Sequence, residues 1–268
     1  MTSRQLGILY GLLAAAIWGG MYVVSDVVLR VIPPFTLLTI RLILGGLVLA
    51  LILSVRKPPG LPRNLRALLG VGLLGFGVSV GLQFVGTDLS TAVNGALITS
   101  AAPAFILVFA ALLLREPMTP RRIFAVALAS LGVLLIVDLT QADFSSDLFV
   151  GNAVLVGAAL TWGLYSVLVR RVSATTDTLV VTLVAFCGGL LLTIPLALVE
   201  LPARPIGTID LPVVLGILYL GVVSTAGAMW LWNRAFALVD AGTASLTFFA
   251  QPVVGALLGA LLLGQTLT

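Results

Sequence analysis

Two prolines interrupt long apolar stretches at matching places in the sequence. Pro103 lies in the stretch SAAPAFI, and Pro252 lies 149 residues later in FFAQPVV. A proline has no amide hydrogen and frees the carbonyl four residues before it, which here belongs to Thr99 and to Phe248. A freed carbonyl in apolar surroundings needs a polar partner, and Gln251 adds an amide beside the second break. Together, such groups suit an ammonium or a neutral amide on a small molecule.

The elements that carry these prolines belong to a chain with the composition of a membrane protein. Of its 268 residues, 60% are hydrophobic and only 9% are charged, whereas about 25% are charged in a typical soluble domain. Its apolar runs are long and uninterrupted, unlike the strands of a β-barrel, which are about ten residues of alternating polarity. We therefore predict an all-α integral membrane protein that contacts the lipid bilayer.

Nine apolar runs are long enough to cross a bilayer, which takes about 20 residues in a helix. The predicted spans are 6–28, 35–54, 65–87, 91–114, 120–138, 148–169, 178–199, 211–236 and 241–263. Pro103 lies about twelve residues into the fourth span and Pro252 about eleven residues into the ninth, so each is close to the bilayer midplane at 1.5 Å of rise per residue. Breaks at corresponding depths favour a transport site. The alternative is two ordinary kinks whose loose groups Ser and Thr satisfy.

Aromatic and polar side chains at similar depth extend this candidate site. Trp18 and Trp162 lie near the middle of their spans, whereas tryptophans that anchor a helix prefer the interfaces. They form either an aromatic cavity wall or a packing contact between helices. By contrast, Trp232 and Asn233 are expected near the inner interface. The candidate substrate-binding residues are Trp18, Tyr22, Gln83, Asn94, Thr99, Ser100, Trp162, Tyr165, Ser166, Trp230, Phe248 and Gln251.

One arginine falls inside a predicted span. Arg41 lies in the outer half of the second span, where an exposed guanidinium would cost several kcal/mol. Asp26 lies in the outer half of the first span, and buried charges usually occur in pairs. We therefore predict a structural ion pair between Asp26 and Arg41. The alternative is that Arg41 meets a carboxylate of the transported molecule.

The basic residues predict the orientation of the chain, because short loops rich in Lys and Arg stay in the cytoplasm. Threading the nine spans in order leaves Arg30 and Arg204 on one side, with Arg41 inside a span. The other eleven fall on the opposite side: Arg4, Arg56, Lys57, Arg63, Arg66, Arg115, Arg121, Arg122, Arg170, Arg171 and Arg234. The amino terminus is therefore predicted to be cytoplasmic.

The chain repeats itself, and the repeat predicts its architecture. AAIWGGMY (15–22) reappears as ALTWGLYS (159–166), LSTAVNGALI (89–98) resembles LVDAGTASLT (238–247), and AALLLREPMT (110–119) resembles GALLLGQTLT (259–268). An odd number of spans per half inverts the second copy in the membrane, as in many secondary transporters. The first half continues into a fifth span, so we expect a tenth span after Thr268. The alternative is a protein of nine spans.

Glycine spacing predicts where helices approach one another closely, because small residues four apart leave room for a neighbouring backbone. The pairs with this spacing include Gly7 and Gly11, Gly77 and Gly81, and Gly255 and Gly259. We expect these positions to pack helices together, including contacts between the two halves.

Several kinds of chemistry are excluded by residues that the sequence lacks. It has no histidine and a single cysteine, Cys187, so it offers neither an internal disulfide nor a Cys/His metal site. No acidic residue lies in the central part of a span, where proton relays place them. No phosphate-binding loop of the type G-x-x-x-x-G-K-[ST] is present. We therefore predict no cofactor, no metal, no enzymatic activity and no proton coupling.

Taken together, these features resemble the drug/metabolite transporter superfamily in its ten-helix form, built from two EamA-type repeats. The resemblance is carried by AAIWGGMYVVSD, ALTWGLYSVLVRR, Arg41 and the endings LLLREPMTPRR and LLLGQTLT, and it covers the whole chain. Within the superfamily the chain is similar to bacterial inner-membrane amino-acid exporters of the YddG kind. The resemblance implies two inverted repeats, 1–140 and 148–268, around a central cavity between spans one to four and six to nine. Gln265 departs from the usual glutamate, which Glu116 provides in the first half.

The predicted function is export of small zwitterionic metabolites, most simply amino acids, by alternating access around a midplane cavity. A neutral cavity with aromatic rings and amides suits a zwitterion, while aromatic faces also hold organic cations. Export of cations or drugs, or a membrane sensor or scaffold without transport, are the alternatives. The expected partners are a small-molecule substrate and the bilayer, without nucleic acid, and the chain is expected to be a monomer in the bacterial inner membrane.

Overall fold

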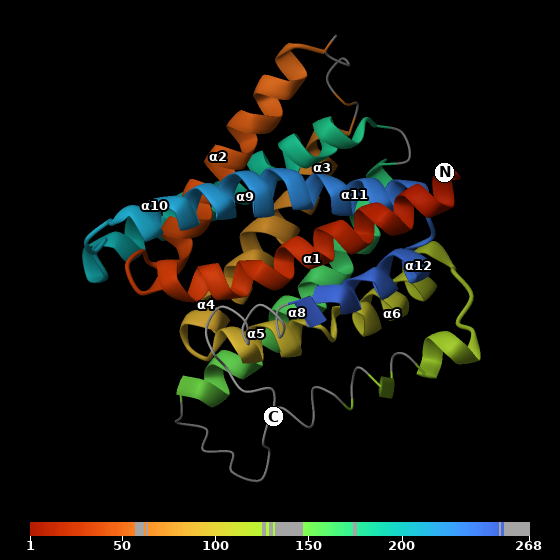
Figure 1. Ribbon diagram of the computed structural model, residues 1–268. Helices are drawn as coiled ribbons and strands as arrows, with labels where there is room; N and C mark the ends of the chain where they lie inside the picture. Colours follow the sequence, from red (N-terminus) through yellow and green to blue (C-terminus); the bar gives the residue numbers. More distant parts are fainter. Residues whose placement is uncertain are drawn as a thin grey trace.

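The fold is helical in every regular element of the described residues. The computed structural model describes residues 1–56, 62, 64–124, 127–128, 131, 147–173, 176–251 and 253–254. Most of the predicted fifth span, Pro252 and the end of the ninth span lie outside these residues. Figure 1 shows the described helices gathered into one bundle.

The first half of the chain contributes four spans, followed by the helical residues 120–124. The third span is one continuous helix made of α3, η1 and α4, of which η1 is a π-helix. The fourth span is divided into α5 and α6. The bounds are α1 Ser3–Leu29, α2 Pro34–Ser54, α3 Leu65–Gly72, η1 Leu73–Ser79, α4 Val80–Asp88, α5 Ala92–Thr99 and α6 Ala102–Leu114.

The second half repeats this plan. Its third span again contains a π-helix, η3, between α10 and α11, and its fourth begins with α12 followed by the short 3-10 helix η4. The bounds are α8 Asp147–Ser173, α9 Thr178–Ala203, α10 Leu211–Leu218, η3 Tyr219–Gly227, α11 Ala228–Leu238, α12 Ala241–Leu246 and η4 Thr247–Phe249.

Six helical segments of the described part are long and apolar enough to cross a membrane: 3–29, 34–54, 65–88, 148–173, 178–203 and 211–238. They agree with six of the predicted spans to within a few residues. Side-chain caps help to set their starts, because they satisfy amide groups that have no partner within the helix. Asp177 accepts from Leu179 N at 2.9 Å at the start of α9, and Asp210 accepts from Val213 N at 3.0 Å at the start of α10.

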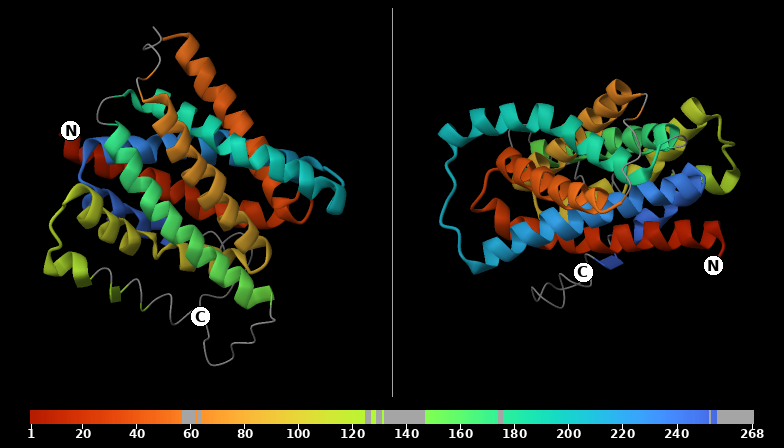
Figure 2. Two further views of the ribbon diagram at one scale, coloured as in Figure 1. Left: turned by 180° about the vertical axis from the view of Figure 1, so that it is seen from behind. Right: turned by 90° about the horizontal axis from the view of Figure 1, so that it is seen from above.

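The two halves are inverted relative to each other. Gly7, near the start of α1, packs against Val239, and Arg170, near the end of α8, donates to the Val239 carbonyl. The start of the first helix of one half therefore lies beside the end of the first helix of the other. Figure 2 shows the same opposition from two further sides. We call this end of the bundle the amino-terminal end and the other the far end.

The distribution of polar and apolar side chains is the reverse of that in a soluble protein. Large apolar residues cover the outside, including Leu47, Leu51, Leu191 and Leu198. Polar side chains lie inside, and the buried ones include Arg41, Thr182, Ser224, Asn233 and Gln251. Lipid cannot satisfy polar groups, so this arrangement fits a bundle whose outer faces contact the bilayer and whose polar groups meet one another within it.

The halves meet most tightly where α3 crosses α9. A Cβ atom added at Gly72 would lie 2.1 Å from the Ala185 carbonyl oxygen, and one added at Gly188 would lie 2.2 Å from the Leu69 carbonyl oxygen. Both obstacles are backbone atoms, so no side-chain rotation relieves them. We call this contact the glycine crossing.

A group of charged residues joins the halves at the amino-terminal end. Arg115 ends α6 in the left-handed conformation, with φ of 56°. The next residue, Glu116, accepts from the amides of Ala241 (3.0 Å) and Gly242 (3.2 Å) at the start of α12. Its carboxylate also lies 3.7 Å from Arg122 and 3.5 Å from Arg170. We call Glu116, Arg122, Arg170 and Asp240 the ionic cluster.

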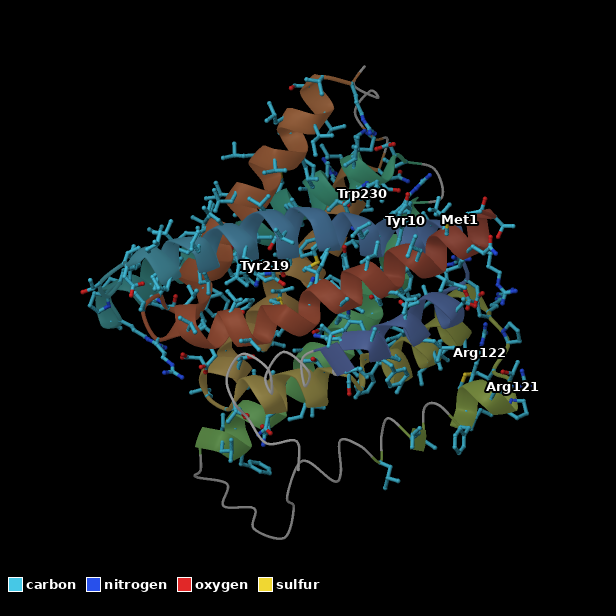
Figure 3. All side chains as sticks on the ribbon, in the orientation of Figure 1. Met1, Tyr10, Arg121, Arg122, Tyr219 and Trp230 are labelled. Atoms are coloured by element: carbon cyan, nitrogen blue, oxygen red, sulfur yellow. The ribbon has the colours of Figure 1, made fainter. Side chains whose placement is uncertain are left out.

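Arg122 connects several parts of the ionic cluster. Its guanidinium donates to Asp240 at 2.7 Å and to the Pro117 carbonyl at 2.7 Å. Figure 3 shows Arg122 at the amino-terminal end of the bundle, close to α12. The cluster therefore connects the loop after α6, the end of α8 and the start of α12.

Similar contacts join the two halves at the far end. Glu200, near the end of α9, accepts from the amides of Phe35 (3.3 Å) and Thr36 (2.9 Å) at the start of α2. Arg204 pairs with Asp88 and donates to the Leu29 carbonyl. At each end, then, a glutamate of one half caps a helix of the other.

Candidate functional site

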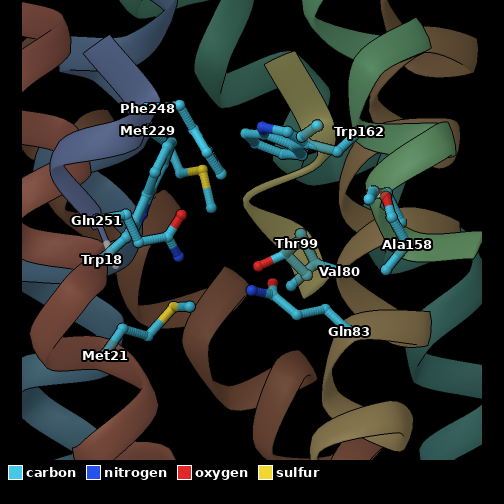
Figure 4. Close-up of a pocket in the computed structure, with 13 residues that line it drawn as sticks. Trp18, Met21, Val80, Gln83, Thr99, Ala158, Trp162, Met229, Phe248 and Gln251 are labelled. Atoms are coloured by element: carbon cyan, nitrogen blue, oxygen red, sulfur yellow. The ribbon is translucent and has the colours of Figure 1, made fainter. Parts of the chain in front are cut away.

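A small cavity lies between the two halves, near the middle of the bundle. Helices α1, α4, α6, α8 and α11 surround it, together with η1, the end of α5, η4 and the helical residues after η4 (Figure 4). None of its described lining residues is ionisable. They are Trp18, Met21, Ser79, Val80, Gln83, Thr99, Ala102, Ala158, Ala159, Trp162, Met229, Phe248 and Gln251.

Aromatic rings form much of the cavity wall. Trp18 and Trp162 meet edge to face, with ring centroids 5.5 Å apart, and Phe248 lies 6.0 Å from Trp18. Trp232 packs behind them, 5.3 Å from Trp18 and 6.3 Å from Trp162. Such ring contacts add to the free energy of burial and hold the rings in defined orientations, so the wall is preorganised.

Buried hydrogen bonds support this wall from behind. Tyr165 donates through its hydroxyl to Asn233 Oδ1 at 2.9 Å, and Asn233 donates to Thr182 Oγ1 at 2.9 Å. Trp232 Nε1 donates to Ser166 Oγ at 3.2 Å. Trp232 and Asn233 are fully buried within the bundle. Burial does not test their depth in the membrane, so the expectation that they lie near the inner interface stays a prediction. Their hydrogen-bond partners on α8 and α9 draw them into the core.

Two amides face the cavity from different helices. Figure 4 shows the side chains of Gln83 and Gln251 reaching the space from opposite sides, with Thr99 nearby. Gln83 comes from α4 in the first half and Gln251 from the helical residues after η4 in the second. A neutral amide offers both a donor and an acceptor, so this lining can bind polar groups without carrying charge.

The fourth span of each half is interrupted beside the cavity. In the first half, Ser100 and Ala101 separate α5 from α6, and Pro103, which is buried, occupies the first turn of α6. This position suits proline, because the first amides of a helix have no partner within it. In the second half, η4 (Thr247–Phe249) interrupts the helix at the equivalent place, while Pro252 lies outside the described residues. The predicted break is therefore present in the first half, and a tightened turn occurs in the second.

The third span of each half carries a feature that sequence reasoning missed. The π-helices η1 and η3 lie in corresponding spans, and π segments are frequent at functional sites. In η3 the Leu220 carbonyl accepts from Thr225 Oγ1 at 2.7 Å, and the Ser224 carbonyl accepts from Trp18 Nε1 at 3.1 Å. One cavity tryptophan is thereby fixed to the π segment of the opposite half.

Arg41 is buried next to the cavity but differs from its predicted role. Its guanidinium donates to the Leu220 carbonyl at 3.3 Å and to Thr225 Oγ1 at 3.0 Å, and it lies 4.7 Å above the Phe84 ring. Asp26 pairs instead with Arg30 of its own helix at 2.6 Å. The predicted Asp26–Arg41 pair is therefore wrong. The i, i+4 spacing brings Arg30 within reach of Asp26, while the π segment η3 supplies oxygen atoms for Arg41.

The sequence pattern that defines the EamA-like transporter family matches this chain twice, over residues 5–138 and 149–268. The chain belongs to the EamA-like transporter family. It is thus a member of the drug/metabolite transporter superfamily and a multi-pass membrane protein, and its family is one of transporters rather than enzymes.

Individual relatives agree with this assignment to EamA. An uncharacterized transporter of Archaeoglobus fulgidus is 28% identical over 253 residues, which cover 91% of this chain and 85% of that protein. A probable amino-acid metabolite efflux pump of Escherichia coli is 27% identical over 282 residues, covering 99% and 89%. A solved crystal structure is similar in fold, with a TM-score of 0.76 at 22% identity, and covers 98% of this chain and 89% of the other.

Within this EamA fold, half of the predicted substrate-binding residues line the cavity. Of the others, Tyr165 and Ser166 stand behind the wall, and Asn94 binds Ser90 and Asn152 at the far end. Trp230 packs against Tyr10 outside the cavity, 5.8 Å between centroids (Figure 3). Ser100 does not line it, and the Tyr22 side chain lies outside the described residues. Those in the lining are Trp18, Gln83, Thr99, Trp162, Phe248 and Gln251.

Sequence reasoning missed the smaller and less polar part of the EamA cavity lining. The missed residues are Met21, Ser79, Val80, Ala102, Ala158, Ala159 and Met229. The three alanines are a weak sequence signal for a cavity, because a small side chain near a midplane aromatic ring leaves space next to that ring. The two methionines carry none, since methionine fills gaps in any apolar core.

Proposed function

We propose that this chain is a secondary transporter that exports small zwitterionic metabolites, with amino acids as the first candidates, by alternating access around the central cavity. Membership of a transporter family supports transport, and the Escherichia coli relative named a probable amino-acid metabolite efflux pump supports the substrate class. The observation that carries the proposal is the cavity itself. It lies between two inverted halves and has a neutral, aromatic and amide-bearing lining.

The neutral lining supports a solute without net charge. A charge in a low-dielectric cavity is costly unless an opposite charge or several dipoles compensate it. A zwitterion brings its own opposite charges, so neutral donors and acceptors suffice to orient it. Aromatic side chains then suit an apolar side chain on the solute, because rings bury a large area with few rotatable bonds.

A second candidate is export of organic cations. Trp18, Trp162 and Phe248 form a ring-rich wall, and a cation above such a ring face gains about 0.5–2 kcal/mol. A simple cation, however, needs no hydrogen-bond donor from the protein. Transport of an amine without a carboxylate would therefore favour this candidate over the first.

The same lining supports transport without proton coupling. Proton-coupled carriers hold the proton on Asp, Glu or His within the membrane, and the described lining residues include none of these. The solute would then move down its own gradient.

The proposed setting is the bacterial inner membrane, with the amino terminus in the cytoplasm and the chain acting as a monomer. The excess of basic residues in the segments at the amino-terminal end supports this orientation. At the far end, Arg30 and Arg204 are each paired with an aspartate.

Counterflow in reconstituted vesicles tests the proposal. Purified protein in proteoliposomes loaded with an unlabelled amino acid should accumulate the same labelled amino acid, and protein-free vesicles should not. Leucine and phenylalanine serve as first probes because of the apolar wall. Dissipating the pH gradient with an ionophore should leave the flux unchanged. Absence of counterflow for every amino acid tested would contradict the proposal, and flux that depends strictly on the pH gradient would contradict uncoupled transport.

A further inference from the structure

Two polar atoms in the cavity wall have no hydrogen-bond partner within the described part of the chain. They are the indole nitrogen of Trp162 and the side-chain oxygen of Gln251. The two side chains are only 7% and 1% exposed. Buried donors and acceptors in folded proteins nearly always have a partner. A lone donor and a lone acceptor in the lining of one cavity therefore point to a molecule that binds there and offers the complementary pair.

Other polar groups of the lining are already used by the protein. Ser79 Oγ donates to the Ala158 carbonyl at 2.9 Å, and Thr99 Oγ1 donates to the Gly95 carbonyl at 2.6 Å. The first bond connects η1 to α8, the second lies within α5, and together they use both hydroxyl hydrogens. Their hydroxyl groups consequently have no hydrogen left to offer to a substrate.

The two cavity tryptophans occupy equivalent positions in the repeats but have different surroundings. Trp18 Nε1 donates to the Ser224 carbonyl at 3.1 Å, so its hydrogen bond connects α1 to η3. Trp162 Nε1 makes no such bond among the described residues. One copy of the duplicated tryptophan therefore supports the structure, while the other leaves its N–H group for recognition.

We propose that Trp162 and Gln251 recognise the two charged ends of one zwitterion. The Trp162 N–H donates to the carboxylate of the substrate, and the Gln251 side-chain oxygen accepts from its ammonium. This assignment rests on the proposed function and goes further by giving each end of the substrate its own protein group. A solute with only an amine satisfies Gln251 alone, and a solute with only a carboxylate satisfies Trp162 alone.

The test crosses truncated solutes with matched substitutions. The solutes are leucine, isopentylamine, which lacks the carboxylate, and 4-methylpentanoate, which lacks the amine. Their affinities for purified protein in lipid nanodiscs are measured by calorimetry. Trp162→Phe keeps an aromatic ring but removes the N–H group, and Gln251→Met keeps the length of the side chain but removes the amide. Trp230→Phe is the control for loss of a tryptophan, because Trp230 lies outside the cavity.

The proposal predicts losses that depend on the solute. Trp162→Phe should weaken leucine and 4-methylpentanoate by about tenfold to a hundredfold, as for a hydrogen bond to a charged group, and should leave isopentylamine within about twofold. Gln251→Met should weaken leucine and isopentylamine and spare 4-methylpentanoate. The spared solute in each case shows that the variant is folded. Trp230→Phe should leave all three unchanged.

Two results overturn the assignment in distinguishable ways. If the wild type binds leucine but each variant weakens all three solutes alike, or none of them, the recognition pair is wrong while transport of zwitterions stands. If the wild type binds neither leucine nor phenylalanine and moves no amino acid in the counterflow assay, the proposed function fails and the pair fails with it.

Discussion

The two halves of the chain meet in two contrasting ways. At the glycine crossing, α3 and α9 pack so closely that backbone meets backbone and a methyl group at Gly72 or Gly188 has no room. At the cavity, aromatic rings line an open space between the halves, and two polar atoms have no hydrogen-bond partner among the described residues.

This contrast separates support from binding. Close-packed backbones tolerate little rearrangement, so the glycine crossing is suited to fix the halves to each other. A cavity with unsatisfied groups sacrifices stability that a bound molecule restores. The same pair of repeats thus builds one contact that resists change and one that needs a ligand. Substitutions in the two regions should therefore fail for different reasons.

The largest effect is expected at the glycine crossing. Gly72→Ala should lower the free energy of unfolding by about 3 kcal/mol or more, because overpacking against a backbone carbonyl leaves no side chain to move aside. Gly70→Ala on the same helix is the matched control, since a Cβ there meets nothing within 4 Å. The control should be neutral or slightly stabilising, because alanine is the better helix former. Chemical denaturation of both variants in detergent micelles measures the difference.

Equal stability of these two alanine variants would show that α3 and α9 separate easily. The contrast between a rigid crossing and an adaptable cavity would then be wrong.

The next largest effect is expected from a charge placed in the cavity. Ala159→Asp should lower stability by about 2–3 kcal/mol, because an ionised side chain within the membrane lacks solvent, and should abolish counterflow of zwitterions. Ala159→Asn, of nearly the same size but neutral, should retain measurable counterflow. Flux and thermal unfolding of both variants test this. Full activity of the aspartate variant would show that the lining accepts a charge, and this would contradict the proposal of a neutral binding site.

A smaller effect is expected at the ends of the bundle. Glu116→Gln should lower the free energy of unfolding by about 1–2 kcal/mol, because it weakens bonds to two amides and removes the attraction of Arg122 and Arg170. Glu200→Gln at the far end is the control, since Glu200 caps α2 through the Phe35 and Thr36 amides but, among the described residues, lies within salt-bridge distance of no arginine and attracts Arg204 only from farther away. Raising salt should shrink the extra loss in Glu116→Gln, because exposed ionic attraction is screened. Identical losses at all salt concentrations would show that the arginines contribute nothing there.

Much of the fold was predictable, because a membrane helix must be long and apolar and its start is often capped. The predicted span 178–199 begins where α9 begins, directly after its cap Asp177, and 211–236 begins with α10 after Asp210. The inverted arrangement followed from the repeated motifs. The glycine crossing could not be predicted from glycine spacing. Four-residue spacing identifies pairs of glycines on one helix, whereas Gly72 and Gly188 lie on two different helices.

The candidate site was predictable where a residue type is out of place at the midplane. Trp18, Trp162, Gln83 and Gln251 were found in this way, and the structure brings them together around one space. Met229 was not found, since an apolar side chain looks the same in a core as in a cavity wall. The π-helices also left no recognisable pattern, because they arise from packing and from bonds such as that of Trp18 to the Ser224 carbonyl.

The smallest expected effect is on pH dependence, and it again contrasts the ionic cluster with the cavity. Burial raises the pKa of Asp240, but hydrogen bonds from the Thr243 side chain and amide and the charges of Arg122 and Arg170 lower it further, so the pKa is below its usual value. A depressed pKa stabilises the fold above the unfolded value of about 4 and loses that contribution as pH falls through the folded value.

The stability difference between wild type and Asp240→Asn should therefore be constant from about pH 5 to 8 and shrink below about pH 4. It should stay below about 1 kcal/mol, because the side chain is 41% exposed. Thermal unfolding of both proteins from pH 3 to 8 measures this difference, and a difference that grows on acidification would contradict the expected direction.

Leucine affinity should stay constant from pH 5 to 8, because no ionisable side chain is among the described cavity lining. A pH-dependent affinity in Asp240→Asn as well as wild type would instead place a titrating group within reach of the substrate.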